Sequence, residues 1–373
     1  MHFTAATVVA VATAVLASEN IAIPLRKVHN VGSVKNLVDR GSAKLRHINS
    51  KTVSARASAP VTNDVVSYVA SVTVGASSYS LIVDTGSSNT WVGAQSAYAP
   101  GPNSQDTGNS VSVSYGSGSF SGEEYTDAVT FAGLTVNAQS IGAASNSQGF
   151  SGVDGIFGVG PVDLTQNTVT NTASVPTFLD NLYSQGTISS EVLGVSFRPE
   201  SGSDTSDTNG ELTLGGTDSS KYKGSISYFP SPGPYWGVSV SSFTYGTKSL
   251  GSGSGIVDTG TTLIYIPTSA YNAFLSAAGG KTDSSSGLAV FSKAPTSNFS
   301  LKINGVTYTL TPAQYLVPQA EYSLFGLTSG KYYAWINNGG SSGVNTIIGQ
   351  KFLENYYSVY DTNNARVGFA ANA

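Results

Sequence analysis

The chain of 373 residues contains no cysteine. This absence excludes a disulfide framework, a thiolate metal site and a cysteine nucleophile. Charged residues are also scarce, at 11%, whereas glycine (42 residues) and tyrosine (20 residues) are abundant. Aromatic residues interspersed with turn-forming glycines are typical of a mainly all-β fold rather than a helical one. The length favours two domains with a sizeable core.

Histidine is confined to the first 57 residues, as His2, His29 and His47. If this leader is removed, the remaining body has no histidine. A Ser-His-Asp triad, a Cys-His pair and a histidine-containing zinc site are then excluded from it. We therefore expect neither a metal nor another cofactor.

An uncharged, mostly apolar run extends from Phe3 to Ala17 and ends in small residues. Its length and its end are typical of a secretory signal peptide, predicted here at residues 1–17, rather than of a membrane span. A buried N-terminal strand or helix is the alternative. No later run is long and apolar enough to cross a bilayer, so the sequence predicts a secreted protein with no membrane partner. Delivery to a vacuole is the alternative to extracellular release.

Charge is distributed unevenly along the chain. Residues 18–57 have a net charge of +6, whereas residues 58–373 have a net charge of −10. This contrast predicts a basic propeptide at residues 18–57, held by the acidic body and loosened when acid protonates the carboxylates of that body. A nucleic-acid-binding arm or a disordered tail is the alternative, but the acidic body argues against a nucleic-acid partner.

One short pattern occurs twice, as LIVDTGSS at residues 81–88 and GIVDTGTT at residues 255–262. In each copy an apolar run leads to an aspartate, a glycine turn and two hydroxyl residues. The repeat predicts an internally duplicated β protein, with one lobe at residues 58–202 and the other at residues 203–373.

The two aspartates, Asp84 and Asp258, would act as a general acid–base pair if the lobes bring them together. Like charges a few ångströms apart do not ionise together easily, so such a pair holds one proton. The ionised partner takes a proton from water, and the protonated partner hydrogen-bonds the carbonyl group that the water attacks. The rest of each motif would support the pair through a close-approaching glycine turn, a threonine that joins the two turns and a hydroxyl that orients the carboxylate. These supporting residues are Gly86 and Gly260, Thr85 and Thr259, and Ser87 and Thr261.

Other interpretations of the repeat stay open at this point. Two β-turns can use Asp and Gly for their shape alone. A glycosidase also uses two carboxylates, but it needs them about 5–9 Å apart, farther than two carboxyl groups that share a proton. A non-catalytic binding protein of the same fold and a Ser/Thr/Gly-rich adhesin are further alternatives.

Local patterns predict a hairpin and two packing helices. The hairpin has a mobile tip at residues 115–119, YGSGS, between two strand-like runs. The first helix has apolar residues from Val175 to Tyr183, with Ser174 as its cap. The second helix extends from Ser269 to Ala278 and ends at Gly279.

Together these motifs resemble the pepsin family of aspartic endopeptidases, in the form of a secreted fungal zymogen. The resemblance covers nearly all of residues 58–373 and includes both Asp-Thr-Gly turns, the tip at residues 115–119, Trp91, DGIFG at residues 154–158 and IIG at residues 347–349. It implies a bilobal fold with a few short helices and a cleft between the lobes. The shared-proton dyad is established chemistry for that family.

The resemblance also implies roles for individual residues. Asp84 and Asp258 would be the catalytic dyad, and Tyr115 with Gly116 and Ser117 would form a flap over a protein or peptide substrate, with the Tyr115 hydroxyl toward Trp91. A basic residue of the leader would block the dyad, so that the propeptide inhibits its own enzyme. The sequence does not choose among Lys44, Arg46 and Lys51 for this residue.

Apolar residues near the predicted cleft favour cleavage between bulky apolar side chains. Serine at position 117, where some fungal relatives have an acidic residue, predicts weak cleavage after lysine. Asn298 begins the sequon Asn298-Phe299-Ser300 and is a candidate for glycosylation. We expect a monomer. The apolar cleft candidates are Ile82, Tyr115, Phe120, Ile156, Ile256 and Ile264.

Overall fold

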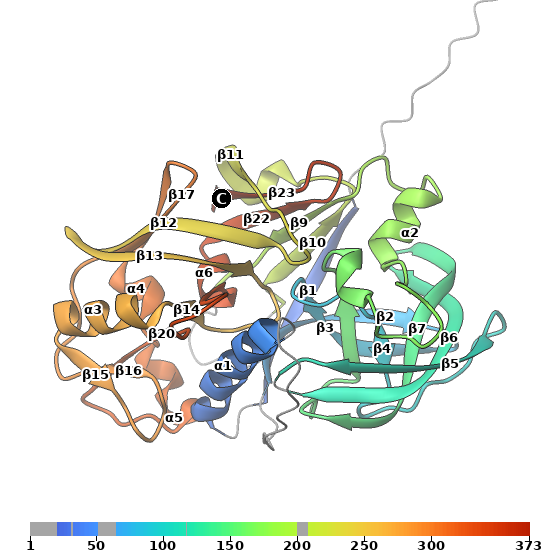
Figure 1. Cartoon of the computed structure of the whole chain (residues 1–373), viewed down its shortest axis with the longest axis horizontal. Helices are drawn as coiled ribbons and strands as arrows, with labels where there is room; N and C mark the ends of the chain where they lie inside the picture. The colour runs from blue at the N-terminus through green and yellow to red at the C-terminus, as the bar shows by residue number, and fades with distance from the viewer. Residues whose placement is uncertain (1–20, 31–32, 51–64, 117, 200–207) are drawn as a thin grey trace, which may run out of the picture.

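The computed structural model describes residues 21–30, 33–50, 65–116, 118–199 and 208–373. The predicted signal peptide, the leader–body boundary at 57/58 and the lobe boundary at 202/203 lie outside these ranges. Strands dominate, and the chain forms two halves with the yellow-to-red half on the left of Figure 1 and the cyan-to-green half on the right. The prediction of a mainly all-β, bilobal fold is confirmed.

A 13-stranded sheet extends through both halves and connects them. Its strands, in sheet order, are β11 (Tyr222–Pro230), β23 (Arg366–Asn372), β22 (Tyr356–Asp361), β9 (Val192–Ser196), β10 (Gly210–Leu214), β1 (Ile21–Asn30), β2 (Val65–Val74), β3 (Ser77–Asp84), β8 (Gly155–Gly158), β4 (Trp91–Val92), β7 (Leu134–Gln148), β6 (Ser119–Phe131) and β5 (Gln105–Ser114).

Two smaller sheets belong to the C-terminal half. The seven-stranded sheet contains, in order, β18 (Val306–Leu310), β17 (Phe299–Ile303), β12 (Gly237–Tyr245), β13 (Lys248–Val257), β21 (Thr346–Ile348), β14 (Ile264–Ile266) and β20 (Ile336–Asn338). The three-stranded sheet contains β15 (Gly280–Thr282), β16 (Ala289–Phe291) and β19 (Tyr332–Ala334).

The two aspartate motifs end equivalent strands. β3 pairs in parallel with β8, with Ile82 opposite Ile156, and β13 pairs in parallel with β21, with Ile256 opposite Ile347. β4 and β14 then pair antiparallel with β8 and β21, respectively. Strands enclosed in this way are buried on both faces, which explains why the runs before each aspartate are wholly apolar.

Helices are short, except in the leader. The helices are α1 (Val34–Ser50), α2 (Phe178–Ser184), α3 (Thr268–Ala278), α4 (Pro312–Tyr315), α5 (Tyr322–Phe325) and α6 (Gln350–Leu353), with 3-10 turns η1 (Val162–Thr165), η2 (Ser219–Lys221) and η3 (Gln319–Glu321). No helix in the described ranges is long and apolar enough to span a membrane.

One helix start was predicted wrongly. The cap of α2 is Thr177 rather than Ser174, because the Thr177 hydroxyl accepts from the Asp180 N–H while the Asp180 carboxylate accepts from the Thr177 N–H. This reciprocal capping box fixes the first turn three residues later than predicted. Tyr183, expected to pack inward, is 41% exposed. The other helix, α3, ends at Gly279 as predicted, with φ 71°.

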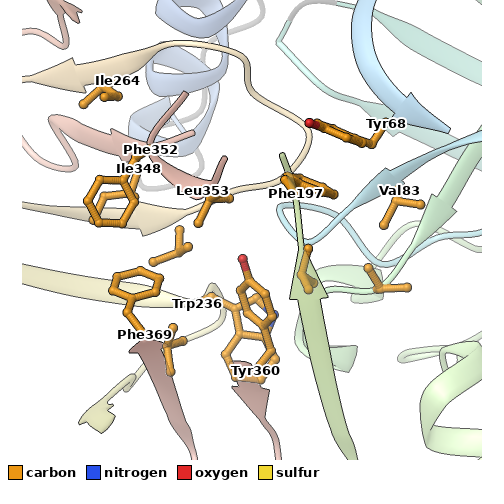
Figure 2. Packing of buried hydrophobic residues seen from close by; sticks show 14 of the residues in the cluster. Tyr68, Val83, Phe197, Trp236, Ile264, Ile348, Phe352, Leu353, Tyr360 and Phe369 are labelled. Carbon is orange, nitrogen blue, oxygen red and sulfur yellow. The ribbon is translucent and has the colours of Figure 1, made fainter. Parts of the chain in front are cut away.

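The hydrophobic core joins the two halves of the molecule, and no disulfide contributes because the chain has no cysteine. Tyr68 stacks on Phe197 with ring centroids 3.6 Å apart, and Trp236 lies 5.4 Å from Tyr360 in the same cluster (Figure 2). Burial of apolar surface stabilises a fold by about 25 cal/mol per Å². Core packing of this kind therefore supplies the stability that disulfides cannot.

The leader is built into this fold. β1 pairs with both β10 and β2 in the large sheet, and α1 lies in front of the junction between the halves in Figure 1. Lys27 of β1 is fully buried, with Nζ 2.6 Å from Glu354 Oε1. Lys351 Nζ lies 3.2 Å from the other Glu354 oxygen. These charges hold the pKa of Glu354 below its usual value, although burial alone would raise it.

Candidate active site

The two Asp-Thr-Gly turns meet at the centre of the molecule. The Thr85 N–H donates to Thr259 Oγ1 over 2.9 Å, and the Thr259 N–H donates to Thr85 Oγ1 over 3.0 Å. Each hydroxyl then donates across the junction, Thr259 to the Val83 carbonyl (2.9 Å) and Thr85 to the Val257 carbonyl (3.4 Å). This reciprocal set of bonds fixes the two turns relative to each other.

Glycine follows each threonine because the opposite carboxylate occupies the space of a side chain. A Cβ on Gly260 would lie 2.3 Å from Asp84 Oδ1, and a Cβ on Gly86 would lie 2.5 Å from Asp258 Oδ1. Both distances are far below van der Waals contact. The glycines thus permit the close approach of the two aspartates.

Each carboxylate accepts the same pair of hydrogen bonds from its own turn. Asp84 accepts from the Gly86 N–H (2.9 Å) and the Ser87 hydroxyl, and Asp258 accepts from the Gly260 N–H (3.0 Å) and the Thr261 hydroxyl. Both aspartates are buried. Hydrogen bonds of this kind orient a carboxylate and favour its ionised form.

Lys44 of α1 lies between the two carboxylates. Its Nζ is 2.7 Å from Asp258 Oδ2 and 3.3 Å from Asp84 Oδ1. Of the two basic candidates that the structure describes, Lys44 and Arg46, Lys44 is thus the one that reaches the pair. Arg46 is exposed on α1, and Lys51 lies outside the described residues.

Burial and neighbouring charges move the pKa values of this cluster in different directions. Burial favours a raised pKa for Asp84, but Lys44, Asp258, Ser87 and Gly86 outweigh it and hold the pKa below the usual value. Burial and the charge of Asp84 keep the pKa of Asp258 above its usual value despite Lys44. Burial disfavours charge on Lys44, yet the two carboxylates raise its pKa. The pKa values of the two carboxyl groups are thus moved apart, and Asp258 holds a proton at higher pH than Asp84 does.

Four aromatic residues form one wall of the site, here called the aromatic wall: Trp91, Tyr115, Phe120 and Phe150. Ring centroids of Trp91 and Phe120 are 4.3 Å apart, and those of Trp91 and Tyr115 are 6.5 Å apart. Tyr115 is buried, and burial together with the charge of Asp84 raises the pKa of its hydroxyl. Among the described residues, the Tyr115 hydroxyl and Trp91 Nε1 have no partner in good hydrogen-bond geometry, although Trp91 is close enough to lower the Tyr115 pKa in part.

Other predicted cleft residues lie beside this wall. Ile82 and Ile156 pack in the same cluster. Gly116 has φ 75°, and a Cβ there would lie 2.6 Å from the Ala43 carbonyl oxygen, so the hairpin tip contacts α1. Ser117, from which weak lysine preference was predicted, lies outside the described residues. A small cavity below α1 is lined by Asp84, Tyr115 and Lys44, among others.

The opposite wall, here called the helix pocket, belongs to the C-terminal half and receives α1. We define it as Ile256, Tyr265, Leu288 and Trp335, which are buried in one cluster with apolar side chains of α1. The α1 residues in that cluster are Val34, Leu37, Val38, Leu45 and Ile48.

One predicted cleft residue was wrong, and its neighbour was missed. Ile264 lies in the main hydrophobic core (Figure 2) rather than in the site. Neighbouring strand residues face opposite sides, so Tyr265 is the residue of β14 that faces α1. The alternation of side chains along residues 264–266 was the available signal. Similarly, helical spacing places Lys44 on the same face as Leu37, Gly41 and Ile48, all buried.

The glycosylation candidate lies at the surface of the C-terminal half. Asn298 is exposed and immediately precedes Phe299, the first residue of β17. The sequon is thus accessible to modification from solvent.

Comparisons with known proteins agree with this geometry. A family model described as eukaryotic aspartyl protease matches residues 67–372. The chain is 47% identical over 336 residues to polyporopepsin of Irpex lacteus, covering 86% of this chain and 98% of the relative. It is 31% identical over 317 residues to pepsin A of Sus scrofa, covering 79% of this chain and 78% of the relative. A solved structure, the aspartic proteinase from Irpex lacteus, superposes with a TM-score of 0.80 and 41% identity, covering 94% and 97% of the two chains.

The chain therefore belongs to the eukaryotic aspartyl protease family. Within that family its relatives are pepsin-type enzymes, and the chain is an aspartic endopeptidase that hydrolyses peptide bonds.

Proposed function

We propose that Asp84 and Asp258 are the catalytic dyad of this endopeptidase. The observation that carries the proposal is the pair of interlocked turns, in which each glycine leaves room for the opposite aspartate. With one proton on the pair, the ionised aspartate removes a proton from a water molecule. The water oxygen bonds to the scissile carbonyl carbon, while the protonated aspartate hydrogen-bonds the carbonyl oxygen. A proton then passes to the leaving nitrogen as the C–N bond breaks.

The test is cleavage of a denatured protein at acid and at neutral pH. Asp84→Asn and Asp258→Asn should each abolish cleavage, because neither variant has both an acid and a base at the site. Asp106→Asn, which alters an exposed aspartate of β5, is the matched control and should retain activity. Cleavage that persists in both dyad variants would exclude this assignment.

We further propose that the chain is a zymogen held inactive by its own propeptide through Lys44. Lys44 occupies the place between the carboxylates where water and substrate carbonyl have to enter. Two groups then make the closed form acid-sensitive. Lys44 depresses the pKa of Asp84, and Lys27 depresses that of Glu354.

The pH dependence follows from the direction of those shifts. A carboxyl whose pKa is depressed in the closed form stabilises that form above its usual pKa, and the contribution is lost as pH falls through the depressed value. Burial and Asp84 raise the pKa of Asp258, but Lys44 lowers it, so protonation of Asp258 also favours release of Lys44. Acidification should thus release the leader.

The remaining predictions complete the proposal. The aromatic wall with Ile82, Ile156 and Ile256 supports cleavage between bulky apolar residues at acid pH. The serine at position 117 supports only weak cleavage after lysine, and a peptide-library profile dominated by lysine would refute this.

We propose a secreted or vacuolar monomer, cut near residue 17 and near residue 57, with no nucleic-acid or membrane partner. Asn298 is its proposed glycosylation site.

A further inference from the structure

Gly41 is an unexpected residue in the middle of α1. Glycine in a helix interior is about 1 kcal/mol less favourable than alanine. A Cβ at this position would lie 2.2 Å from Cε2 and 2.3 Å from both Cζ and Oη of Tyr265. The ring of Tyr265 therefore packs directly on the backbone of α1, in the space that any other side chain would fill.

Tyr265 also bonds to the helix at this point. Its hydroxyl donates to the Val38 carbonyl over 2.8 Å and lies 3.3 Å from the Leu37 carbonyl. These bonds go to the backbone, so they recognise a helix at a fixed depth rather than a particular side chain. Tyr265 is fully buried, and its ring belongs to the helix pocket.

Gly41 and Lys44 are three residues apart, so they share one face of α1. Where the ring of Tyr265 meets Gly41, it limits how closely α1 can approach the pocket. That approach sets where Lys44 Nζ lies relative to Asp258 and Asp84. A side chain at position 41 would lift the helix and withdraw the lysine.

We propose that Tyr265 and Gly41 form a matched contact by which the cleft recognises its inhibitory helix. The helix pocket fits an amphipathic helix with the pattern Gly-x-x-Lys. The glycine of that helix leaves space for the Tyr265 ring, and its lysine reaches the dyad. This proposal rests on the proposed block of the dyad by Lys44. It adds which helices can deliver a lysine to the dyad. Helices with a larger residue in place of the glycine are excluded by the clash with the ring.

Hydrogen–deuterium exchange of α1 amides in the full-length chain at neutral pH tests this contact. Gly41→Ala should raise exchange roughly tenfold, because overpacking a filled site is strongly unfavourable. In a Tyr265→Leu background, which lacks the clashing ring atoms, the same change should have an effect of less than about twofold, as in a double-mutant cycle. Arg46→Gln, on the exposed face of α1, is the control and should leave exchange unchanged.

The outcomes separate this proposal from the one on which it rests. No effect of Gly41→Ala, or an equal effect in both backgrounds, overturns the matched contact. If Gly41→Ala does not fold, Tyr265→Phe decides: it removes only the hydroxyl and should raise exchange about threefold, and unchanged exchange overturns the proposal. Failure of the proposed block would appear elsewhere, as a Lys44→Gln chain that stays inactive while α1 exchange follows the pattern above.

Discussion

The two walls of the site differ in how much the leader contributes to their packing. The buried cluster of the aromatic wall contains no leader residue, and the partly buried Val28 of β1 is the one leader side chain packed against it among the described residues. The helix pocket of the C-terminal half is completed by five apolar residues of α1. Between them, Lys44 forms the ionic contact with the dyad. The leader is thus held by apolar packing of α1 on one side and by charge at the centre, while its apolar contribution to the other wall is confined to Val28.

The largest effect is expected for Phe120→Ala in the aromatic wall. Phe120 is buried and stacks on Trp91, so the truncation should lower the free energy of unfolding by about 3–5 kcal/mol. Because the leader adds only the partly buried Val28 to this cluster, the loss should be nearly equal with and without the leader. Chemical denaturation of both forms measures it. A loss confined to the full-length chain would break the distinction between the walls.

A somewhat smaller effect is expected for Leu37→Ala in α1. Leu37 is buried in the helix pocket, and its truncation should weaken docking of α1 by about 2–5 kcal/mol. The change should appear in amide exchange of α1 and in the pH at which activity develops. The enzyme without its leader cannot be affected, because residue 37 is no longer present. Arg46→Gln is the matched control, and equal exchange in the two variants would contradict the account.

The smallest effect is expected for Glu124 of β6, the strand that also contains Phe120 of the aromatic wall. Burial raises the pKa of Glu124 to about 7, and the Ser140 hydroxyl donates to its carboxyl group. A group with a raised pKa contributes stability that is present below its unfolded value and lost as pH rises through the folded one. Glu124→Gln should therefore stabilise the protein above pH 7, by up to about 3 kcal/mol, and change little near pH 4.

Thermal unfolding across pH measures this effect. Glu123→Gln, at the exposed neighbouring position, is the control and should not change the profile. If both variants give the same profile at alkaline pH, burial of Glu124 is not the cause. Because Glu124 lies outside the leader, its effect should be independent of α1.

Sequence reasoning succeeded where the pattern is local and repeated. The duplicated aspartate turns, the wholly apolar strands before them and α3 could be predicted because each depends on neighbouring residues. Tyr265 was missed, because its role depends on a helix more than 200 positions away in sequence. Ile264 was predicted near the cleft instead. Alternation along β14 separates the two residues, and the contact of Tyr265 with α1 shows which of them faces the cleft.

Lys44 shows the same limit in another form. The basic character of the leader was visible, but the choice of one lysine required the helix face that Leu37 and Ile48 define. Thr177 was missed as a cap because its capping box depends on Asp180, whereas apolar spacing alone extended the helix to Val175. In each case a specific partner, rather than residue type, decided the outcome.

The central claim is that Lys44 keeps an otherwise complete dyad silent. Its most direct test is peptidase activity of the full-length chain with Lys44→Gln, measured at a mildly acid pH at which the wild-type full-length chain is still inactive. The account predicts cleavage by the variant without prior acid treatment, abolished again by Asp258→Asn in the same chain. A Lys44→Gln chain that is folded and as silent as the wild type would contradict it.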